Sequence, residues 1–230
     1  QPSPEDVMKL WDALLQENDA VVHVPLTSGL SGAAQTALML SEEEKYAGKV
    51  FVSDSRGVSV TQRQHCLFAK RLSAEGKTPE KIRDILNQNA ERNSIFIAVD
   101  SLKYLKRGGR ITPMAAAIGT LLHIKPVLTI VRGGKLDSYT KVRTQKMAKE
   151  AIISGLWEDL RKKHGDPDGS HCYLAVAYTD NPEQAEQFAS ELSESFPKRL
   201  NPKIVVEPLS LLISCHIGQN GLGAALIEEL

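Results

Sequence analysis

The chain has 230 residues, of which 42% are hydrophobic and 24% are charged, so it carries enough apolar side chains for one large or two modest cores. Its 28 Lys and Arg residues balance 28 Asp and Glu residues, and a formal net charge of zero provides no overall attraction for nucleic acid or an anionic membrane. No apolar run approaches the roughly 20 residues that a membrane helix requires. Three cysteines are too few for a disulfide framework, so we expect a reducing, cytoplasmic environment.

The first half of the sequence alternates between helical and strand patterns. Apolar residues at helical spacing follow a Ser3-Pro4 start signal, which predicts a helix over residues 4–16. Further helices are predicted at 33–44, at 60–75 and after the Thr78-Pro79 cap, and strands at 20–26, 49–53 and 94–99. Strands that alternate with helices pair in parallel, which favours a doubly wound α/β arrangement. Two complete strands are few for such a sheet, so we expect another strand upstream of Gln1.

The pattern changes near residue 100. A short helix at 102–107 and one that starts at Pro113 precede two strand runs, 126–131 and 136–142, whose Gly133-Gly134 link favours a hairpin. A helix at 145–163, a strand at 172–178, a helix after Asn181-Pro182 and a strand at 204–207 complete the pattern. We therefore predict two α/β domains, residues 1–97 with a parallel doubly wound sheet and residues 98–230 with a mixed sheet.

Residues 27–32 (Thr-Ser-Gly-Leu-Ser-Gly) are the most informative segment, because they join a predicted strand to the next helix. Ligands bind at that crevice in open α/β sheets. Glycines let the backbone approach a ligand, a helix N-terminus offers N–H groups, and Thr27, Ser28 and Ser31 add hydroxyls. The loop suits a carboxylate or a phosphate, but the same residues would also form a simple tight turn in which Ser31 caps the helix.

A serine-dependent esterase or acyltransferase is an alternative function for this loop. Ser28 would be the nucleophile, His216 the base, and the loop around Gly29 would supply oxyanion donors. A triad is recognised by geometry and not by order in the sequence. The nucleophile elbow Gly-x-Ser-x-Gly is incomplete, however, since Ala33 stands where its last glycine would be.

Motifs for metals and nucleotide cofactors are missing from the sequence. The pairs His171-Cys172 and Cys215-His216 do not have zinc-ligand spacing, since adjacent residues on a strand face opposite sides. Neither a phosphate-binding loop nor a dinucleotide fingerprint is present. We therefore expect no metal and no cofactor.

Residues 102–110 (LKYLKRGGR) place four cations around two glycines. Lys106 and Arg107 fit a solvated helix whose C-terminal dipole favours positive charge. Arg110 follows the glycines and precedes the apolar Ile111, so we expect it to point inward toward an anionic or carbonyl partner. The segment has no interleaved aromatic residues and no excess charge behind it, so we expect no nucleic-acid partner.

Taken in order, these segments resemble the DegV family of bacterial fatty-acid-binding proteins over nearly the whole chain. The most specific match is the Leu-x-Tyr-Leu-x-x-Gly-Gly-Arg string that ends at Arg110. The other matches are Ser3, the loop Ser28-Gly29-Leu30-Ser31-Gly32, Asp54-Ser55, Lys125-Pro126, Val142-Arg143-Thr144 and His216-Ile217-Gly218. The resemblance implies two α/β domains with a buried acyl pocket between and within them. It also implies a non-catalytic role, in which the protein presents a long-chain fatty acid to a separate ATP-dependent kinase subunit that forms the acyl phosphate.

Carried over residue by residue, the resemblance makes Ser28 the hydroxyl that binds the fatty acid carboxylate, with Thr27 and the Gly29 N–H beside it. Arg110 and His216 correspond to the arginine and histidine that the family places near the head group. A wall of the acyl pocket is expected on the helix after Pro113, from Met114, Ile118, Leu121 and Leu122. We expect contact with the membrane to be transient only.

The sequence departs from the family pattern at three places. The usual Gly-Thr-Tyr-Gln after the serine loop is Gly32-Ala33-Ala34-Gln35, which removes a hydroxyl and a ring beside the head group. The usual His-x-Gly-Pro-Gly is His216-Ile217-Gly218-Gln219-Asn220-Gly221, and we expect this change to relax the turn that orients His216. The family's threonine ligand would fall upstream of Gln1, so head-group binding is expected to be weaker in this form.

Overall fold

The computed structural model describes residues 1–118, 124–131, 133–200 and 204–230, and these form two compact units. The first unit is Gln1–Glu91 together with Leu230, and the second is Arg92–Glu229. The units divide before residue 97, where the sequence placed the domain boundary, because the strand β3 (Ser94–Ala98) pairs with strands of the second unit. In the described ranges, no helix is long and apolar enough to cross a membrane.

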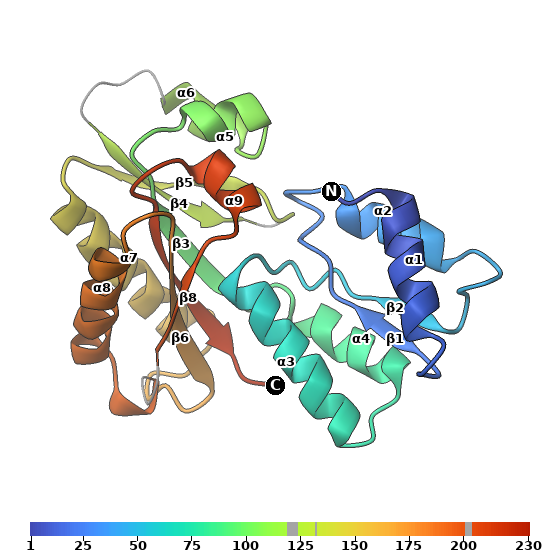
Figure 1. Cartoon of the computed structure of the whole chain (residues 1–230). Helices are drawn as coiled ribbons and strands as arrows, with labels where there is room; N and C mark the ends of the chain where they lie inside the picture. The colour runs from blue at the N-terminus through green and yellow to red at the C-terminus, as the bar shows by residue number, and fades with distance from the viewer. Residues whose placement is uncertain (119–123, 132, 201–203) are drawn as a thin grey trace. The chain divides into compact units, whose positions relative to one another are not determined.

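The first unit is a two-stranded parallel sheet with four helices (Figure 1). Strand β1 (Val21–His23) pairs with β2 (Val50–Val52) in the register Val21 to Val50, which confirms the predicted parallel pairing. The helices are α1 (Pro4–Leu14), α2 (Ala33–Ser41), α3 (Val60–Ala74) and α4 (Pro79–Asn89). The predicted caps are present, since the side chains of Ser3 and Thr78 each accept a backbone N–H from the first turn of α1 and α4.

Trp11 anchors the core of the first unit. Its side chain is 1% exposed and packs edge-on against the rings of Tyr46, at a centroid distance of 5.2 Å, and His23, at 5.5 Å. Buried residues of α2 and β2 complete this cluster. This cluster packs the helix α1 against the strands of the first unit, from which the loop after β1 begins.

The second unit is built on a six-stranded sheet with the order β5-β4-β3-β8-β6-β7. Only β6 and β7 pair in parallel among the described strand pairs of this sheet, so the sheet is mixed, as predicted. Its other strands are β4 (Lys125–Ile130), β5 (Leu136–Val142), β6 (Cys172–Tyr178), β7 (Val205–Pro208) and β8 (Leu222–Glu228). Its helices are α5 (Lys103–Gly108), α6 (Pro113–Ile118), α7 (Gln145–Lys162), α8 (Pro182–Ser195), α9 (Leu211–Ile217) and the 3₁₀ turn η1 (Lys198–Leu200).

The predicted hairpin between β4 and β5 is confirmed. The two strands are antiparallel neighbours, and Gly133 and Gly134 in the turn have φ angles of 92° and 79°. Residues other than glycine rarely adopt this left-handed backbone conformation. The consecutive glycines are therefore required by the turn.

The strand β8 and the helix α9 were missed by the sequence analysis. Strand β8 lies between β3 and β6 and is buried along six of its seven residues, so its sequence shows no alternation of polar and apolar side chains. Gly223 has no room for a side chain, since a Cβ there would lie 2.8 Å from the Phe96 carbonyl oxygen. In the sequence Gly223 resembles a turn residue, but in the structure it is required for the close pairing of β8 with β3.

Helices α7 and α8 pack on the sheet of the second unit and bury its main core. Ile152, Leu156 and Leu160 of α7 and Phe188 and Leu192 of α8 are fully buried in this cluster. The shorter helices α5, α6 and α9 gather away from α7 and α8 (Figure 1). This second group carries the predicted head-group residues of the unit.

Candidate functional site

Residues 27–32, here called the serine loop, join β1 to α2 and fold around Thr27. The Thr27 side chain is fully buried, and its carbonyl oxygen accepts the N–H groups of Leu30 and Ser31, both at 3.1 Å. The Thr27 N–H donates to the carbonyl of Gly57 at 3.1 Å. The loop is thus a tight turn held by its own backbone and by the segment after β2.

The three hydroxyls of the serine loop have different surroundings. The Thr27 hydroxyl accepts the Gly29 N–H at 3.3 Å, and the Ser31 hydroxyl accepts the N–H of Ala33, the first residue of α2, at 3.2 Å, although Gly32 is the N-cap of that helix. Ser28 is exposed, and its hydroxyl makes no hydrogen bond to any residue that the structure describes. Ser28 therefore presents the hydroxyl that is open to a ligand.

Residues 54–59, here called the support loop, follow β2 and contact the serine loop. Because parallel strands end at the same edge of a sheet, both loops lie at the carboxyl edge of β1 and β2. Arg56 and Ser59 both have a φ angle of 52°, which is uncommon for residues other than glycine. Gly57 has no room for a side chain, since a Cβ would lie 2.8 Å from the Gln62 backbone.

His65 lies beneath the support loop. A Cβ on Gly57 would lie 3.1 Å from its Nδ1 atom. Burial lowers the pKa of His65 to about 4, and a hydrogen bond with the Asn89 side chain opposes this shift only in part. The imidazole is therefore neutral at neutral pH and serves as a packed support.

In the second unit, Arg110 and His216 come together around Gly108. Helix α5 ends in a left-handed Gly109 with φ of 68°, and the Arg110 N–H donates to the Leu105 carbonyl at 3.2 Å. The half-buried Arg110 guanidinium donates to the Gly108 carbonyl, the kind of partner that the sequence predicted. The His216 ring covers the same residue, since a Cβ on Gly108 would lie 2.6 Å from its Nδ1 atom.

The turn after α9 is held by hydrogen bonds. Asn220 has φ of 55°, its backbone N–H donates to Asp180 at 2.8 Å, and its side chain donates to Asp100 at 2.8 Å. Asp100 in turn pairs with Lys125. Asparagine tolerates the left-handed backbone, and the Asn220 amide joins the turn to a neighbouring loop, while a relaxation relative to the family's turn stays a prediction.

The predicted ligand residues divide between the units. Thr27, Ser28 and Gly29 lie in the first unit, and Arg110 and His216 in the second. Of the predicted pocket wall, Met114 on α6 is 75% exposed and Ile118 ends that helix. Leu121 and Leu122 lie outside the described residues.

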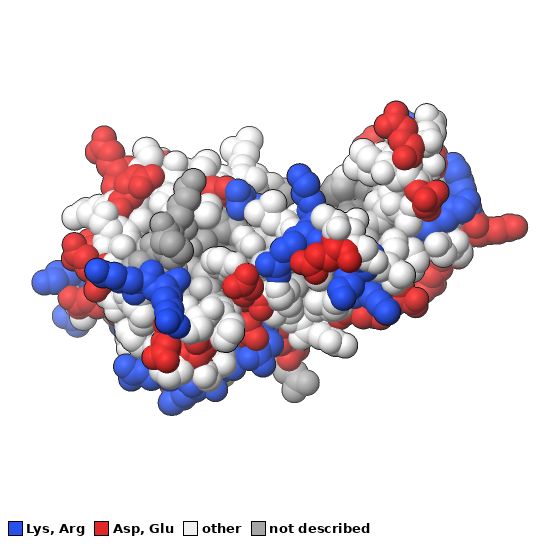
Figure 2. All heavy atoms as spheres, turned by 90° about the horizontal axis from the view of Figure 1, so that it is seen from below, with Lys and Arg blue, Asp and Glu red and all other residues white. Residues whose placement is uncertain are grey.

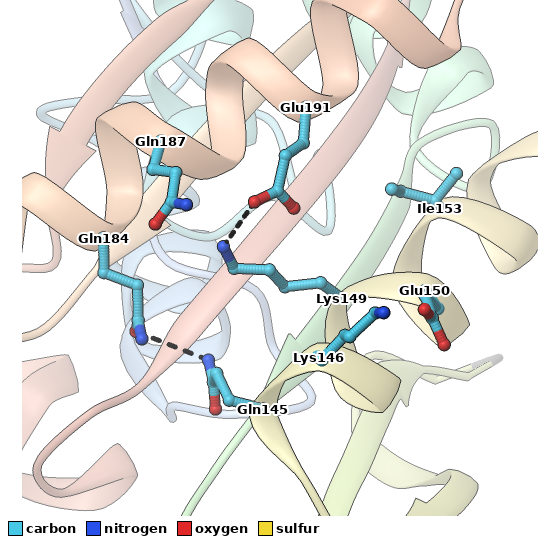
Figure 3. A pocket seen from close by; sticks show the side chains of 8 residues that line it. All are labelled: Gln145, Lys146, Lys149, Glu150, Ile153, Gln184, Gln187 and Glu191. Carbon is cyan, nitrogen blue, oxygen red and sulfur yellow. Dashed lines mark hydrogen bonds and ion pairs between the residues drawn. The ribbon is translucent and has the colours of Figure 1, made fainter.

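A cavity of about 420 Å³ lies between α7 and α8 (Figure 3). Lys149 Nζ and Glu191 Oε1 form an ion pair across it at 2.8 Å, and Gln145 donates to Gln184 at 3.4 Å. The predicted ligand residues do not line it. Its polar groups join the two helices to each other.

Elsewhere in the described ranges, no group of three or more His, Cys, Asp or Glu residues is placed to hold a metal ion.

The fold defines a class of α/β protein that combines a small parallel unit with a larger mixed-sheet unit. A family model described as "Uncharacterised protein, DegV family" matches residues 1–229. The chain therefore belongs to the DegV family, which confirms the resemblance seen in its sequence.

Relatives and solved structures are similar to this chain over its whole length or nearly so. A DegV domain-containing protein of Caldanaerobacter subterraneus subsp. tengcongensis is 30% identical over 230 residues, which cover 100% of this chain and 78% of the relative. A fatty-acid-binding DegV family protein from Thermus thermophilus has a TM-score of 0.86 at 28% identity, with coverage of 99% of this chain and 78% of that protein. DegV of Bacillus subtilis, a fatty acid binding protein, has a TM-score of 0.81 at 28% identity, with coverage of 100% and 78%.

Two contacts of the site were not predicted from the sequence. The Asp54 carboxylate accepts the Ser28 N–H, and Gly108 provides the space that His216 occupies. The position of Asp54 directly after a strand was a usable signal, because β1 and β2 are parallel neighbours. The contact between Gly108 and His216 had no signal in the sequence.

Proposed function

We propose that this protein binds a long-chain fatty acid, holds its carboxylate at Ser28 and does not itself catalyse a reaction. The observation that carries the proposal is the exposed Ser28 hydroxyl on a loop whose other hydroxyls are used internally. Solved relatives that cover the same residues bind fatty acids, which supports the same class of ligand here.

The acyl chain supplies most of the affinity in this proposal. Burial contributes about 0.8 kcal/mol for each CH₂ group, so a dozen methylenes give roughly 10 kcal/mol before the association cost of several kcal/mol. A hydrogen bond from Ser28 to the charged carboxylate adds about 1.5–3 kcal/mol. Ser28 therefore orients a ligand that the tail retains.

Arg110 and His216 are proposed to act at the head group as well. The Gly108 carbonyl already positions the Arg110 guanidinium, which is a planar cation suited to a carboxylate. A cation there would offset the charge of a carboxylate while a separate ATP-dependent kinase subunit transfers the γ-phosphoryl group to it. The products would be an acyl phosphate and ADP. The kinase would thus supply the chemistry and this protein the substrate.

Loading of the lipid is proposed to need only transient contact with a membrane from the cytoplasm. Leu211 and Leu212 on α9 are 80% and 57% exposed, and α9 packs against α5, which carries Lys103, Lys106 and Arg107. Exposed leucines beside lysine and arginine suit a brief encounter with anionic lipid. The face seen from below in Figure 2 is a different one, and on it acidic and basic side chains are interspersed without an extended basic surface. Co-flotation with anionic vesicles that persists unchanged in a Leu211→Ser, Leu212→Ser variant would contradict this route.

The test of the proposal is mass spectrometry of an organic extract, followed by fatty acid binding to Ser28→Ala and Ser31→Ala. We expect a stoichiometric long-chain fatty acid in the wild type. Ser28→Ala should weaken binding by about 1.5–3 kcal/mol without loss of stability. Ser31→Ala is the matched control, because loss of its hydrogen bond to the Ala33 N–H should cost about 1 kcal/mol of folding stability and leave binding in place.

The outcomes separate lipid carriage from the alternative. Equal retention by Ser28→Ala and the wild type would remove Ser28 from the head-group site. Labelling of Ser28 by a fluorophosphonate, together with an extract free of lipid, would favour a serine-dependent esterase or acyltransferase that uses Ser28 and His216.

A further inference from the structure

We propose that Asp54 is a positioning residue for the head-group site, and that it fixes the serine loop so that Ser28 can present its hydroxyl. One carboxylate oxygen, Oδ1, accepts the N–H of Ser28 at 3.2 Å and the N–H of Arg56 at 3.4 Å. A single side chain therefore ties the serine loop to the support loop. The inference rests on the proposed function, since it assigns a role within that site.

A second tie acts beside the first. The Thr27 N–H donates to the Gly57 carbonyl at 3.1 Å, so two consecutive residues of the serine loop are bound to the support loop. Thr27 is fully buried and Ser28 is exposed. The pair of ties thus sets which of the two side chains points away from the core.

Contacts within the first unit hold the support loop in place. Arg56 and Ser59 keep a left-handed backbone, which persists only where the surroundings fix it. Ser53, just before the loop, and Ser55, within it, are fully buried, and the Arg56 side chain pairs with Glu91 of the same unit. The Asp54 carboxylate is therefore attached to a rigid segment.

The hydrogen bond from the Ser28 N–H to Asp54 also determines which donor of Ser28 is available to an anion. Because the Ser28 N–H is held by the Asp54 carboxylate, Ser28 contributes its hydroxyl and not its N–H. The negative charge of Asp54 opposes a second carboxylate nearby. The useful part of Asp54 is therefore the acceptor oxygen and not the charge, and an asparagine would retain that oxygen.

The experiment compares Asp54→Ala with Asp54→Asn in the full chain. Oleate and palmitate binding, thermal unfolding and amide hydrogen exchange at Ser28 and Arg56 are measured for each. Asp54→Ala should bind about tenfold more weakly and exchange both amides faster. Asp54→Asn should keep the protection and bind at least as tightly as the wild type, because it keeps the acceptor and removes the like charge.

Asp166→Ala is the matched control. Asp166 also accepts two backbone N–H groups, from Ser170 at 2.9 Å and His171 at 2.8 Å, but it does so in a turn of the second unit that carries no predicted ligand. Its loss should lower stability and leave fatty acid binding unchanged. A fall in binding for both variants would mean that general destabilisation, and not positioning, explains the Asp54 effect.

The remaining outcomes are equally distinct. Equal binding by Asp54→Ala and the wild type, or an equal loss in Asp54→Ala and Asp54→Asn, would overturn the positioning role alone. Should Asp54→Ala not fold, a Ser28 amide that exchanges at the rate of an unstructured peptide in the wild type would overturn it as well. A wild type that retains no fatty acid would overturn the proposed function, and the assignment of Asp54 with it.

Discussion

Replacing Gly108 by alanine tests the arrangement of Arg110 and His216 most directly. A Cβ at this position would lie 2.6 Å from Nδ1 and 2.8 Å from Cε1 of His216, and 3.5 Å from Cδ of Arg110. The first two separations are shorter than van der Waals contact, so the His216 ring has to move. The third is an ordinary contact, so Arg110 should move less.

The expected free energy change is small because two effects oppose each other. Alanine in a helix is favoured over glycine by about 1 kcal/mol, whereas overpacking costs about 1–3 kcal/mol. His216 is only half-buried at the end of α9, so its ring can turn outward and relieve much of the overlap. We expect Gly108→Ala to lose about 0–2 kcal/mol of folding stability. If His216 acts at the head group as proposed, fatty acid binding should weaken by more than this loss of folding stability, because the ring is displaced.

The assay combines chemical denaturation, fatty acid binding and the NMR signals of the His216 imidazole. Gly109→Ala is the control, because its Cβ would have no atom within 4 Å although its φ of 68° makes an alanine strained. It should lose about 1 kcal/mol of stability and leave the His216 signals in place. Unchanged His216 signals in Gly108→Ala would refute the close packing on which this reasoning depends.

Two further predictions concern stability. The folded chain keeps His65 neutral, with a pKa of about 4 against the ordinary 6.5, so the unfolded chain binds a proton that the folded chain does not. The free energy of unfolding should therefore fall by up to about 3 kcal/mol as the pH drops from 6.5 toward 4. In guanidinium unfolding, the stability of His65→Gln should depend less on pH than that of the wild type. An equal pH dependence of the two proteins would contradict this role of His65. Lys149→Met should change thermal stability by less than about 1 kcal/mol, because Met keeps the aliphatic packing and Glu191 is partly hydrated, whereas Lys149→Ala should cost about 2 kcal/mol. A Met variant that loses as much stability as the Ala variant would show that the ion pair outweighs the packing.

Local signals predicted most of the fold. The caps at Ser3, Thr78 and Asn181 and the paired glycines at 133–134 act within a few residues, so the elements that they start or join were recognised. The strand β8 was missed because full burial removes the alternation that identifies a strand. The strand β3 belongs to the second compact unit because its partners, β4 and β8, follow it in the sequence, and no local signal at residues 94–98 indicates such partners.

The site was predicted only in part, for a similar reason. The loop around Ser28 stood out because it lies between a strand and a helix, which is a local pattern, and the role of Ser28 there stays a prediction. The contact of Asp54 with Ser28 depends on which strands are neighbours, and the contact of His216 with Gly108 depends on how α9 packs on α5. Such contacts follow from the tertiary fold and leave no periodic trace in the sequence.

The central place of β8 has a consequence for the order in which the protein is made. During synthesis, β3 and β6 leave the ribosome long before residues 222–228, and each keeps an open hydrogen-bonding edge until β8 inserts between them. We therefore expect the first unit to fold while the chain is still being synthesised, and the second unit to fold only after β8 has been made. Nascent chains that stop before residue 222 should then resist proteolysis only over residues 1–91. During that interval the open edges of β3 and β6 would make the second unit the part of the nascent chain that is most prone to aggregation.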